Sequence, residues 1–354
     1  MAESGRRVSA LQIAGVYIGT VVGAGFASGQ EMLQFFAVYG DLGYVGLAIV
    51  TLLFAVFGWI IMDLGFNLGS TSYLQITRYA GGKWIGGFTD LVIGFFLFGG
   101  LAAMFAGAGA MLHQVFGLPA ILGASVMALL TVLTVMSGLS GVINSITIVV
   151  PFLILSAVGV SVASFFVNPV PVSPVDIGVM ENPVVGNWFL SAILYVSYNT
   201  VTTIAVLGPV GATARDRRAF RWGAVIGGLG LGVGALAIFL AIKANIAGLY
   251  GVEIPMLAIS ARISPLMQTV YAFVLVAEIY TTAVADLYGF TARVVGAGSP
   301  RFKLITVLVA VLALLFSQIG FVSLVRYLYP SVGYAGVIFL GCLVLTRFRR
   351  KPGL

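Results

Sequence analysis

The strongest constraint on the fold of this chain is its succession of long apolar stretches. Of its 354 residues, 60% are hydrophobic and 8% are charged. A helix needs about 20 apolar residues to cross the hydrocarbon core of a bilayer, and the apolar stretches repeatedly exceed that length. Backbone polar groups find no water at that depth, so helices that satisfy their own hydrogen bonds are favoured. The sequence therefore predicts an all-α protein that spans a membrane many times.

A transmembrane hydropathy window predicts ten membrane-spanning helices. A short amphipathic helix is also predicted around 254–263, starting at Pro255. Residues 1–167 form the predicted first five-helix repeat, 168–186 a proline-rich extracellular connector, and 187–354 the second repeat. An odd number of spans in each half gives the halves opposite topologies, as in an inverted repeat. The predicted spans are 9–38, 43–69, 84–112, 119–137, 141–167, 187–212, 219–245, 265–293, 302–318 and 321–346.

The net charge of +7 follows the predicted topology. Basic residues occupy every second connection. The alternate connections carry acids such as Asp41 and Glu253 with few cations. The positive-inside rule then places both termini in the cytoplasm of a bacterial cell, with the chain in the cytoplasmic membrane as a multi-pass protein. This charge pattern requires no nucleic-acid partner. The connection between spans six and seven carries Arg215, Arg217, Arg218 and Arg221.

The first predicted span is interrupted by glycines at Gly19, Gly23, Gly25 and Gly29. Non-helical backbone at membrane depth is tolerated where it lines a cavity or holds a ligand. A half-helix that ends near Val22 would present carbonyl groups suited to a cation. A half-helix that starts near Gly25 or Phe26 would present amides suited to a carboxylate. The alternative is that the glycines only allow close helix packing.

The sixth span repeats this feature, because it turns polar in its middle and contains Pro209 between Gly208 and Gly211. We therefore predict that helices one and six are both discontinuous and meet at a central solute site. The expected solute-binding residues come from both breaks. They are Gly23, Ala24, Gly25, Phe26 and Ser28 in the first helix, and Tyr195, Ser197, Tyr198 and Asn199 in the sixth.

The eighth span carries Glu278, Thr281 and Thr282 on one helical turn. Their oxygens indicate a site for a hard cation, whereas the alternative is that each threonine bonds a carbonyl one turn back in its own helix. Acids inside spans usually pair or titrate, so proton coupling remains an alternative to a cation. The residues assigned to coupling or gating are Glu31, Asp63, Glu278 and Asp286, with helix-end salt bridges as the alternative for Asp63 and Asp286.

The run from Gly19 to Gly25 resembles the Gly-x-x-Val-Gly-x-Gly stretch in the unwound first helix of LeuT-fold sodium symporters. The whole chain resembles YkvI-type membrane proteins of the amino acid-polyamine-organocation superfamily. This resemblance implies the LeuT fold, with ten helices in a five-plus-five inverted repeat. It also implies a Na⁺ site made of the carbonyls of Gly19, Val22 and Glu278 and the hydroxyls of Thr281 and Thr282.

Two features separate the chain from members of related families. Residues 26–31 depart from the aromatic-Arg-Phe-Pro continuation of neurotransmitter-sodium symporters. Proton-coupled relatives place a lysine in the fifth span, but residues 144–167 contain none.

We therefore expect a secondary transporter that moves a small solute, with an amino acid as the first candidate, by alternating access coupled to Na⁺. The alternative is an H⁺-coupled or uncoupled transporter of an amine or other organic solute. An ion channel is disfavoured because no filter motif is present. The single cysteine, Cys342, and single histidine, His113, exclude a Cys/His metal site or a His-based triad within one chain, so we expect neither an enzyme nor an organic cofactor. The expected assembly is a monomer or homodimer in the lipid bilayer.

Overall fold

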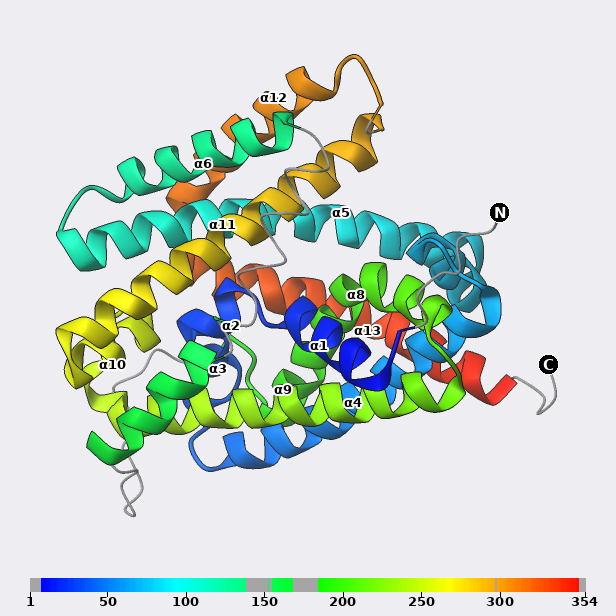
Figure 1. The fold of residues 1–354 in the computed structure, drawn as a ribbon, viewed down its shortest axis with the longest axis horizontal. Helices are drawn as coiled ribbons and strands as arrows, with labels where there is room; N and C mark the ends of the chain where they lie inside the picture. The colour runs from blue at the N-terminus through cyan, green and yellow to red at the C-terminus, as the bar shows by residue number, and fades with distance from the viewer. Residues whose placement is uncertain (1–7, 138–151, 153–154, 168–183, 297, 350–354) are drawn as a thin grey trace.

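The computed structural model describes residues 8–137, 152, 155–167, 184–296 and 298–349, and these residues are almost entirely helical (Figure 1). Within this described part, seven helices are long and apolar enough to cross a membrane, and three shorter apolar helices accompany them. The longer helices are α4 (Leu42–Leu68), α5 (Tyr73–Phe116), α8 (Trp188–Thr213), α9 (Arg217–Asn245), α11 (Pro265–Val295), α12 (Phe302–Phe316, continued by η4, Ser317–Ile319) and α13 (Phe321–Arg349).

Most predicted spans are confirmed within a few residues. α6 (Ala120–Met136) matches the fourth span, and α10 (Pro255–Ile263) matches the predicted short helix between spans seven and eight. η3 (Ile246–Gly248) extends α9. The fifth span is described only as the helix Leu155–Val167, because the start of the predicted range and the predicted connector lie outside the described residues. The count of ten spans and the division into two repeats therefore stay predictions.

The third span begins earlier than predicted. α5 starts at Tyr73, with the Ser72 hydroxyl accepting a hydrogen bond from the Leu74 amide at 3.3 Å. Gly82 interrupts this helix with φ 65° and ψ −165°, a conformation that only glycine adopts without strain. A hydropathy window misses this first piece because it carries polar residues.

The first span is broken as predicted. α1 (Ala10–Val21) starts with a capping box between Ser9 and Gln12 and ends where Val22 and Gly23 become extended. α2 (Ala24–Ser28) follows, and Gly29 at φ 84° then turns the chain into α3 (Gln30–Phe35) and η1 (Ala37–Tyr39). The second turn at Gly29 was not predicted.

The prediction of a discontinuous sixth helix is wrong. α8 runs without interruption from Trp188 to Thr213, with Pro209 inside it. Its polar side chains bond within the helix: the Asn199 amide donates to the Tyr195 carbonyl at 2.9 Å, and the Thr203 hydroxyl donates to the Asn199 carbonyl at 2.8 Å. These polar groups are thus satisfied inside a continuous helix, and their presence in the sequence does not require a break.

The helices form two groups around the broken segment (Figure 1). α4 packs against α8 and α9, and α1 lies on α9. α5 packs against α6, α11 and α13, and α13 also packs against α8, so it joins the two groups. α4 and α8 approach closely because Gly65 lies against the backbone of Gly208, where a Cβ would clash. α2 contacts α11 and α10, so the break lies in the interior.

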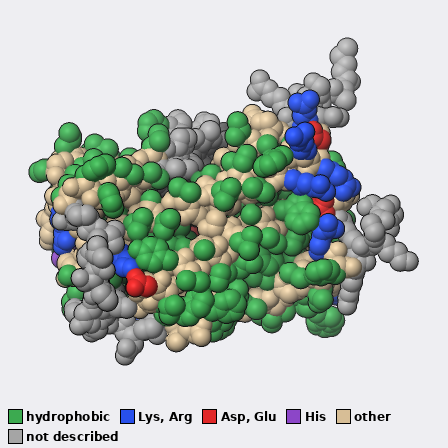
Figure 2. Space-filling view, turned by 90° about the horizontal axis from the view of Figure 1, so that it is seen from below, with side chains coloured by type: hydrophobic (Ala, Val, Ile, Leu, Met, Phe, Trp, Pro, Cys, Tyr) green, Lys and Arg blue, Asp and Glu red, His purple; other side chains and the backbone are tan. Residues whose placement is uncertain are grey.

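The side chains on the surface are of the kinds expected for a membrane protein. Figure 2 shows hydrophobic side chains over most of this face, and Lys and Arg gathered mainly at one end. Among the basic residues of the described part, Arg217 pairs with Asp63, and Lys243 pairs with Asp41. The chain is therefore a multi-pass membrane protein, and the predicted cytoplasmic placement of the termini stays a prediction.

Candidate solute and ion site at the helix break

The break between α1 and α2 brings backbone donors and acceptors into the protein interior. The last hydrogen bond of α1 runs from the Val22 amide to the Ile18 carbonyl at 2.8 Å, and Gly23 caps α2 without a side chain. The amides of the first turn of a helix have no acceptor within that helix. In α2 these amides belong to Ala24, Gly25 and Phe26, and the whole of α2 is buried. The predicted ends of both half-helices are confirmed within two residues.

α11 presents the predicted cation ligands to this break. A Cβ on Gly23 would lie 4.0 Å from the Thr282 hydroxyl oxygen, so these two residues are neighbours. The Thr282 hydroxyl donates to Glu278 Oε1 at 3.3 Å, and the Thr281 hydroxyl donates to the Glu278 carbonyl at 3.1 Å. The Thr281 hydroxyl therefore bonds a carbonyl one turn back in its own helix, whereas the Thr282 hydroxyl bonds the Glu278 side chain. Gly19 and Val22 lie in the last turn of α1 beside Gly23.

The Glu278 side chain adds an acceptor that the sequence analysis had not assigned to the ion site. Glu278 is 3% exposed. Within the described part of the chain, its Oε2 atom is buried and has no hydrogen-bond partner. A buried carboxylate oxygen without a donor is unfavourable, unless a cation or proton meets it. The arrangement can therefore bind a small cation between the break and α11.

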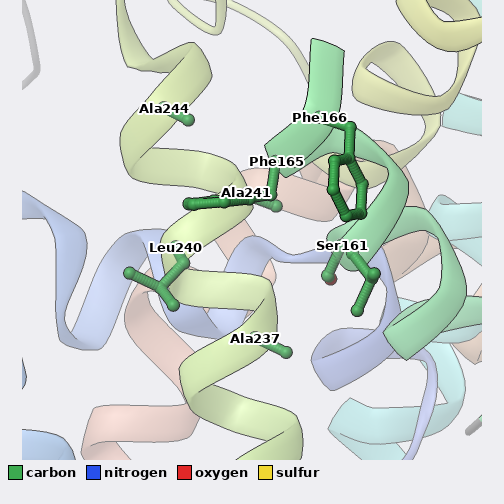
Figure 3. A pocket seen from close by; sticks show the side chains of 8 residues that line it. Ser161, Phe165, Phe166, Ala237, Leu240, Ala241 and Ala244 are labelled. Atoms are coloured by element: carbon green, nitrogen blue, oxygen red, sulfur yellow. The ribbon is translucent and has the colours of Figure 1, made fainter. Parts of the chain in front are cut away.

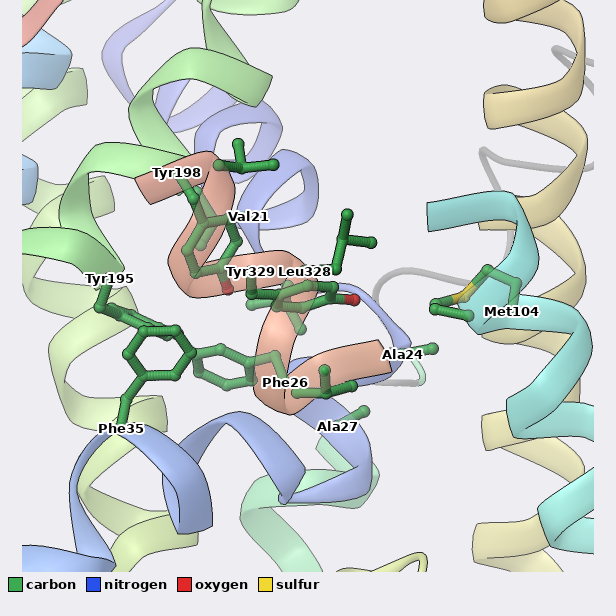
Figure 4. Close-up of a cluster of buried hydrophobic side chains, with 14 of the residues drawn as sticks. Val21, Ala24, Phe26, Ala27, Phe35, Met104, Tyr195, Tyr198, Leu328 and Tyr329 are labelled. Carbon is green, nitrogen blue, oxygen red and sulfur yellow. The ribbon is translucent and has the colours of Figure 1, made fainter. Parts of the chain in front are cut away.

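Glu31 forms the second polar centre of the site. Its Oε2 atom accepts hydrogen bonds from the hydroxyls of Tyr198 at 2.5 Å and Tyr195 at 3.1 Å. A Cβ on Gly25 would clash with Glu31 Oε1 and would lie 3.1 Å from the Tyr329 hydroxyl. The carboxylate of Glu31 thus lies directly against the backbone of the broken helix. Figure 4 shows Tyr195, Tyr198 and Tyr329 gathered near α2 and α3.

The remaining predicted solute ligands are already engaged by the protein. The Ser197 hydroxyl donates to the Gly333 carbonyl of α13 at 2.7 Å, and the Ser28 hydroxyl donates to the Gly25 carbonyl at 2.9 Å. Asn199 bonds within α8. Tyr195 and Tyr198 are thus the two α8 residues whose polar groups meet the Glu31 carboxylate at the break. Sequence reasoning missed Tyr329, whose signal was a tyrosine beside Pro330 in the middle of an apolar span.

The other two acids predicted for coupling or gating, Asp63 and Asp286, have different partners. Asp63 pairs with Arg217 at 3.9 Å near the end of α4. This is the helix-end salt bridge that the sequence offers as the alternative to a coupling or gating role. Asp286 is 7% exposed, and within the described part of the chain its Oδ2 atom is buried without a hydrogen-bond partner. A Cβ on Gly100 of α5 would lie 2.6 Å from that oxygen. Asp286 is thus a second buried acid of α11.

A cavity of about 290 Å³ is lined in part by α3, the helix that carries Glu31. α3 contributes Gln30, Leu33 and Gln34 to its lining, and the segment before α10 contributes Glu253. The Gln30 amide donates to the Glu253 carbonyl at 2.8 Å, which ties that segment to α3. We call this space the vestibule.

A further cavity of about 210 Å³ lies between the helix Leu155–Val167 and α9 (Figure 3). Its lining is apolar except for Ser161, whose hydroxyl donates to the Ala157 carbonyl at 2.7 Å. This cavity offers no free polar group to a solute, so we place the functional site at the helix break.

No family model matches the chain. The uncharacterized membrane protein YkvI of Bacillus subtilis (strain 168) is 28% identical to it over 346 residues, which is 98% of each chain. The uncharacterized protein YyaD of the same strain is 29% identical over 329 residues, covering 93% of this chain and 94% of that protein. The resemblance to YkvI-type membrane proteins is therefore confirmed over nearly the whole chain.

Solved structures resemble the fold at low sequence identity. The inward facing conformation of Mhp1 aligns with a TM-score of 0.62 at 14% identity, covering 98% of this chain and 76% of that chain. A substrate-bound, outward-open Na⁺-coupled sialic acid symporter gives 0.61 at 15% identity, covering 98% and 80%. MhsT in complex with L-phenylalanine gives 0.59 at 16% identity, covering 97% and 86%. The fold is therefore the LeuT fold.

The two glycines of the break should respond differently to an added methyl group. Gly25→Ala should lower the free energy of unfolding by about 1–3 kcal/mol, because its Cβ displaces Glu31 and the Tyr329 hydroxyl. Gly23→Ala is the control, since its Cβ meets nothing closer than 4.0 Å. Thermal unfolding of the purified variants measures both effects, and equal melting temperatures would contradict the described position of Glu31.

Proposed function

We propose that the chain is a secondary active transporter of a small solute. The solute is an amino acid, and its movement by alternating access is coupled to Na⁺. The observation that carries this proposal is the interrupted segment between α1 and α2, which faces Thr282 and Glu278 in the protein interior. Helix breaks of this kind form the solute and ion sites of secondary transporters. The similarity of the fold to a Na⁺-coupled symporter supports the same function.

The Na⁺ ion would bind between the end of α1 and α11. Na⁺ is a hard cation that prefers oxygen ligands, and the hydroxyls of Thr281 and Thr282 are buried or half-buried there. The carbonyls of Gly19 and Val22 would complete the shell from α1. Glu278 would contribute its carbonyl and also its carboxylate, whose Oε2 atom has no other partner in the described part of the chain.

The carboxylate of the amino acid would bind the first amides of α2, from Ala24, Gly25 and Phe26. These donors belong to the backbone, and a Cβ on Gly23 would meet nothing closer than 4.0 Å, so a ligand can approach the backbone there. Tyr195 and Tyr198 would hold the polar end of the solute from α8. Ser28, Ser197 and Asn199 would support the site through the hydrogen bonds described above.

Alternating access would follow from the two groups of helices around the break. α4, α8 and α9 form one packed group, and α5, α6 and α11 form another (Figure 1). The ion site joins α1 and α2 to α11, so a bound ion would hold the broken segment against the second group. Movement of one group against the other would then open the central site to one side at a time.

The position of Glu31 favours one second candidate function, which is H⁺-coupled transport of an amine. Its carboxylate lies against Gly25, close to the place assigned to the solute carboxylate. If Na⁺ has no effect and acid pH drives uptake, Glu278 becomes the leading coupling residue. Glu278→Gln should then uncouple transport.

Loss of the α11 hydroxyls should abolish the response to Na⁺. Thr281→Val and Thr282→Val keep the shape of the side chain but remove an oxygen ligand, so each should lose Na⁺-dependent stabilisation while remaining folded. Melting temperatures of the purified proteins in NaCl and in KCl at equal ionic strength measure this response, since a ligand that binds the folded state raises the melting temperature. Unchanged Na⁺ dependence in both variants would remove this ion site.

The proposed carboxylate site should distinguish solutes of equal shape. An amino acid found by a thermal-shift screen in Na⁺ should bind far better than its amide or methyl ester, because both keep the shape and lose the negative charge. Titration calorimetry with such a matched set decides the point. Equal affinities would reject the α2 amides as the carboxylate site and favour the amine transporter.

A further inference from the structure

We propose that Glu31, together with Tyr195, Tyr198 and Tyr329, binds a protonated amino group of the solute. This inference rests on the proposed transport function, because it names the group of the solute that the site recognises. It applies to both candidate solutes, since an amino acid and an amine share a protonated amino group.

The charge of Glu31 has no protein counter-ion in the described part of the chain. The ion pairs found there join Asp63 to Arg217, Asp41 to Lys243 and Asp90 to Arg293. Glu31 is only 4% exposed, so water compensates its charge poorly. A buried carboxylate without a cation is costly, and charged groups inside membrane spans commonly mark substrate or ion pathways.

The tyrosine hydroxyls favour the ionised form of this carboxylate. Tyr195 and Tyr198 both donate to the same atom, Oε2. Donors that bond the charged form of a carboxyl group favour that form over the neutral acid. Oε1, on the Gly25 side, is the atom of Glu31 that faces the broken helix, where a solute would lie.

Aromatic rings surround this carboxylate. The rings of Tyr198 and Tyr329 have centroids 5.0 Å apart, and Phe96 lies 5.6 Å from Tyr329 and 6.1 Å from Tyr198. Phe35 lies 5.2 Å from Tyr195. Aromatic faces attract ammonium groups, particularly where water is excluded. A carboxylate within a group of such rings is the chemistry that selects an organic cation.

The vestibule adjoins the helix that carries Glu31, because α3 contributes Gln30 and Gln34 to its lining. Glu253 also lines the vestibule, and the described lining residues include no Lys or Arg. An acidic lining raises the local concentration of a cationic solute.

Three probes of similar size, n-butylammonium, n-butanol and butyrate, test this inference on the purified full-length protein. Each is titrated at constant NaCl concentration and ionic strength, and the melting temperature is recorded. n-Butylammonium should raise the melting temperature in a saturable way, whereas n-butanol and butyrate should not. In Glu31→Gln the apparent affinity for n-butylammonium should fall at least about tenfold, because a charge-assisted contact is lost.

Two further variants keep the test decisive. Asp41→Asn removes an acid that pairs with Lys243 outside the site, and it should keep the n-butylammonium response. Tyr198→Phe keeps the ring and loses the hydroxyl that donates to Glu31 at 2.5 Å, so it should weaken the response even if Glu31→Gln fails to fold. A Glu31→Gln or Tyr198→Phe protein that responds like the parent would overturn the inference. Equal stabilisation of the parent by n-butanol or butyrate, or no stabilisation by n-butylammonium, would also overturn it.

The Na⁺ response, measured on the same samples, separates this inference from the proposed function. Loss of the amine response with Na⁺ stabilisation intact would reject the amino-group site alone. An intact amine response without any effect of Na⁺ would instead reject Na⁺ coupling.

Discussion

The helix break at Val22 and Gly23 is the constraint on which the rest of this structure depends. An extended pair of residues inside a membrane protein leaves carbonyls and amides that lipid cannot satisfy. The protein encloses them between two groups of helices and places the polar groups of α11 and α8 opposite them. The same constraint explains why α2 is entirely buried although it contains only five residues.

Three buried acids give this interior its chemical character. Glu31 is held by two tyrosine hydroxyls and Glu278 by one threonine hydroxyl, whereas Asp286 Oδ2 has no hydrogen-bond partner in the described part of the chain. Burial of negative charge favours the binding of cations. Na⁺ near Glu278 and a protonated amino group near Glu31 would each supply a cation, so ion and solute would both stabilise this acidic interior.

Hydropathy and glycine spacing predicted the helices and the first break because both are local properties of the sequence. The continuity of α8 could not be predicted, since it depends on whether Asn199 and Thr203 bond their own helix or a ligand. The contact of Glu31 with Gly25 depends on the left-handed turn at Gly29, which redirects α3. Tyr329 reaches the same place from α13, and such long-range contacts leave no periodic signal in a single sequence.

Uptake by proteoliposomes is the most direct test of the claim that this break is the site of ion-coupled solute transport. Vesicles containing the purified protein would be given a mixture of radiolabelled amino acids, with Na⁺ either outside only or at equal concentration on both sides. The account predicts accumulation above the external concentration only with the inward Na⁺ gradient, and its loss in Thr282→Val. Accumulation that is absent in both conditions, or equal with and without the gradient, would contradict it.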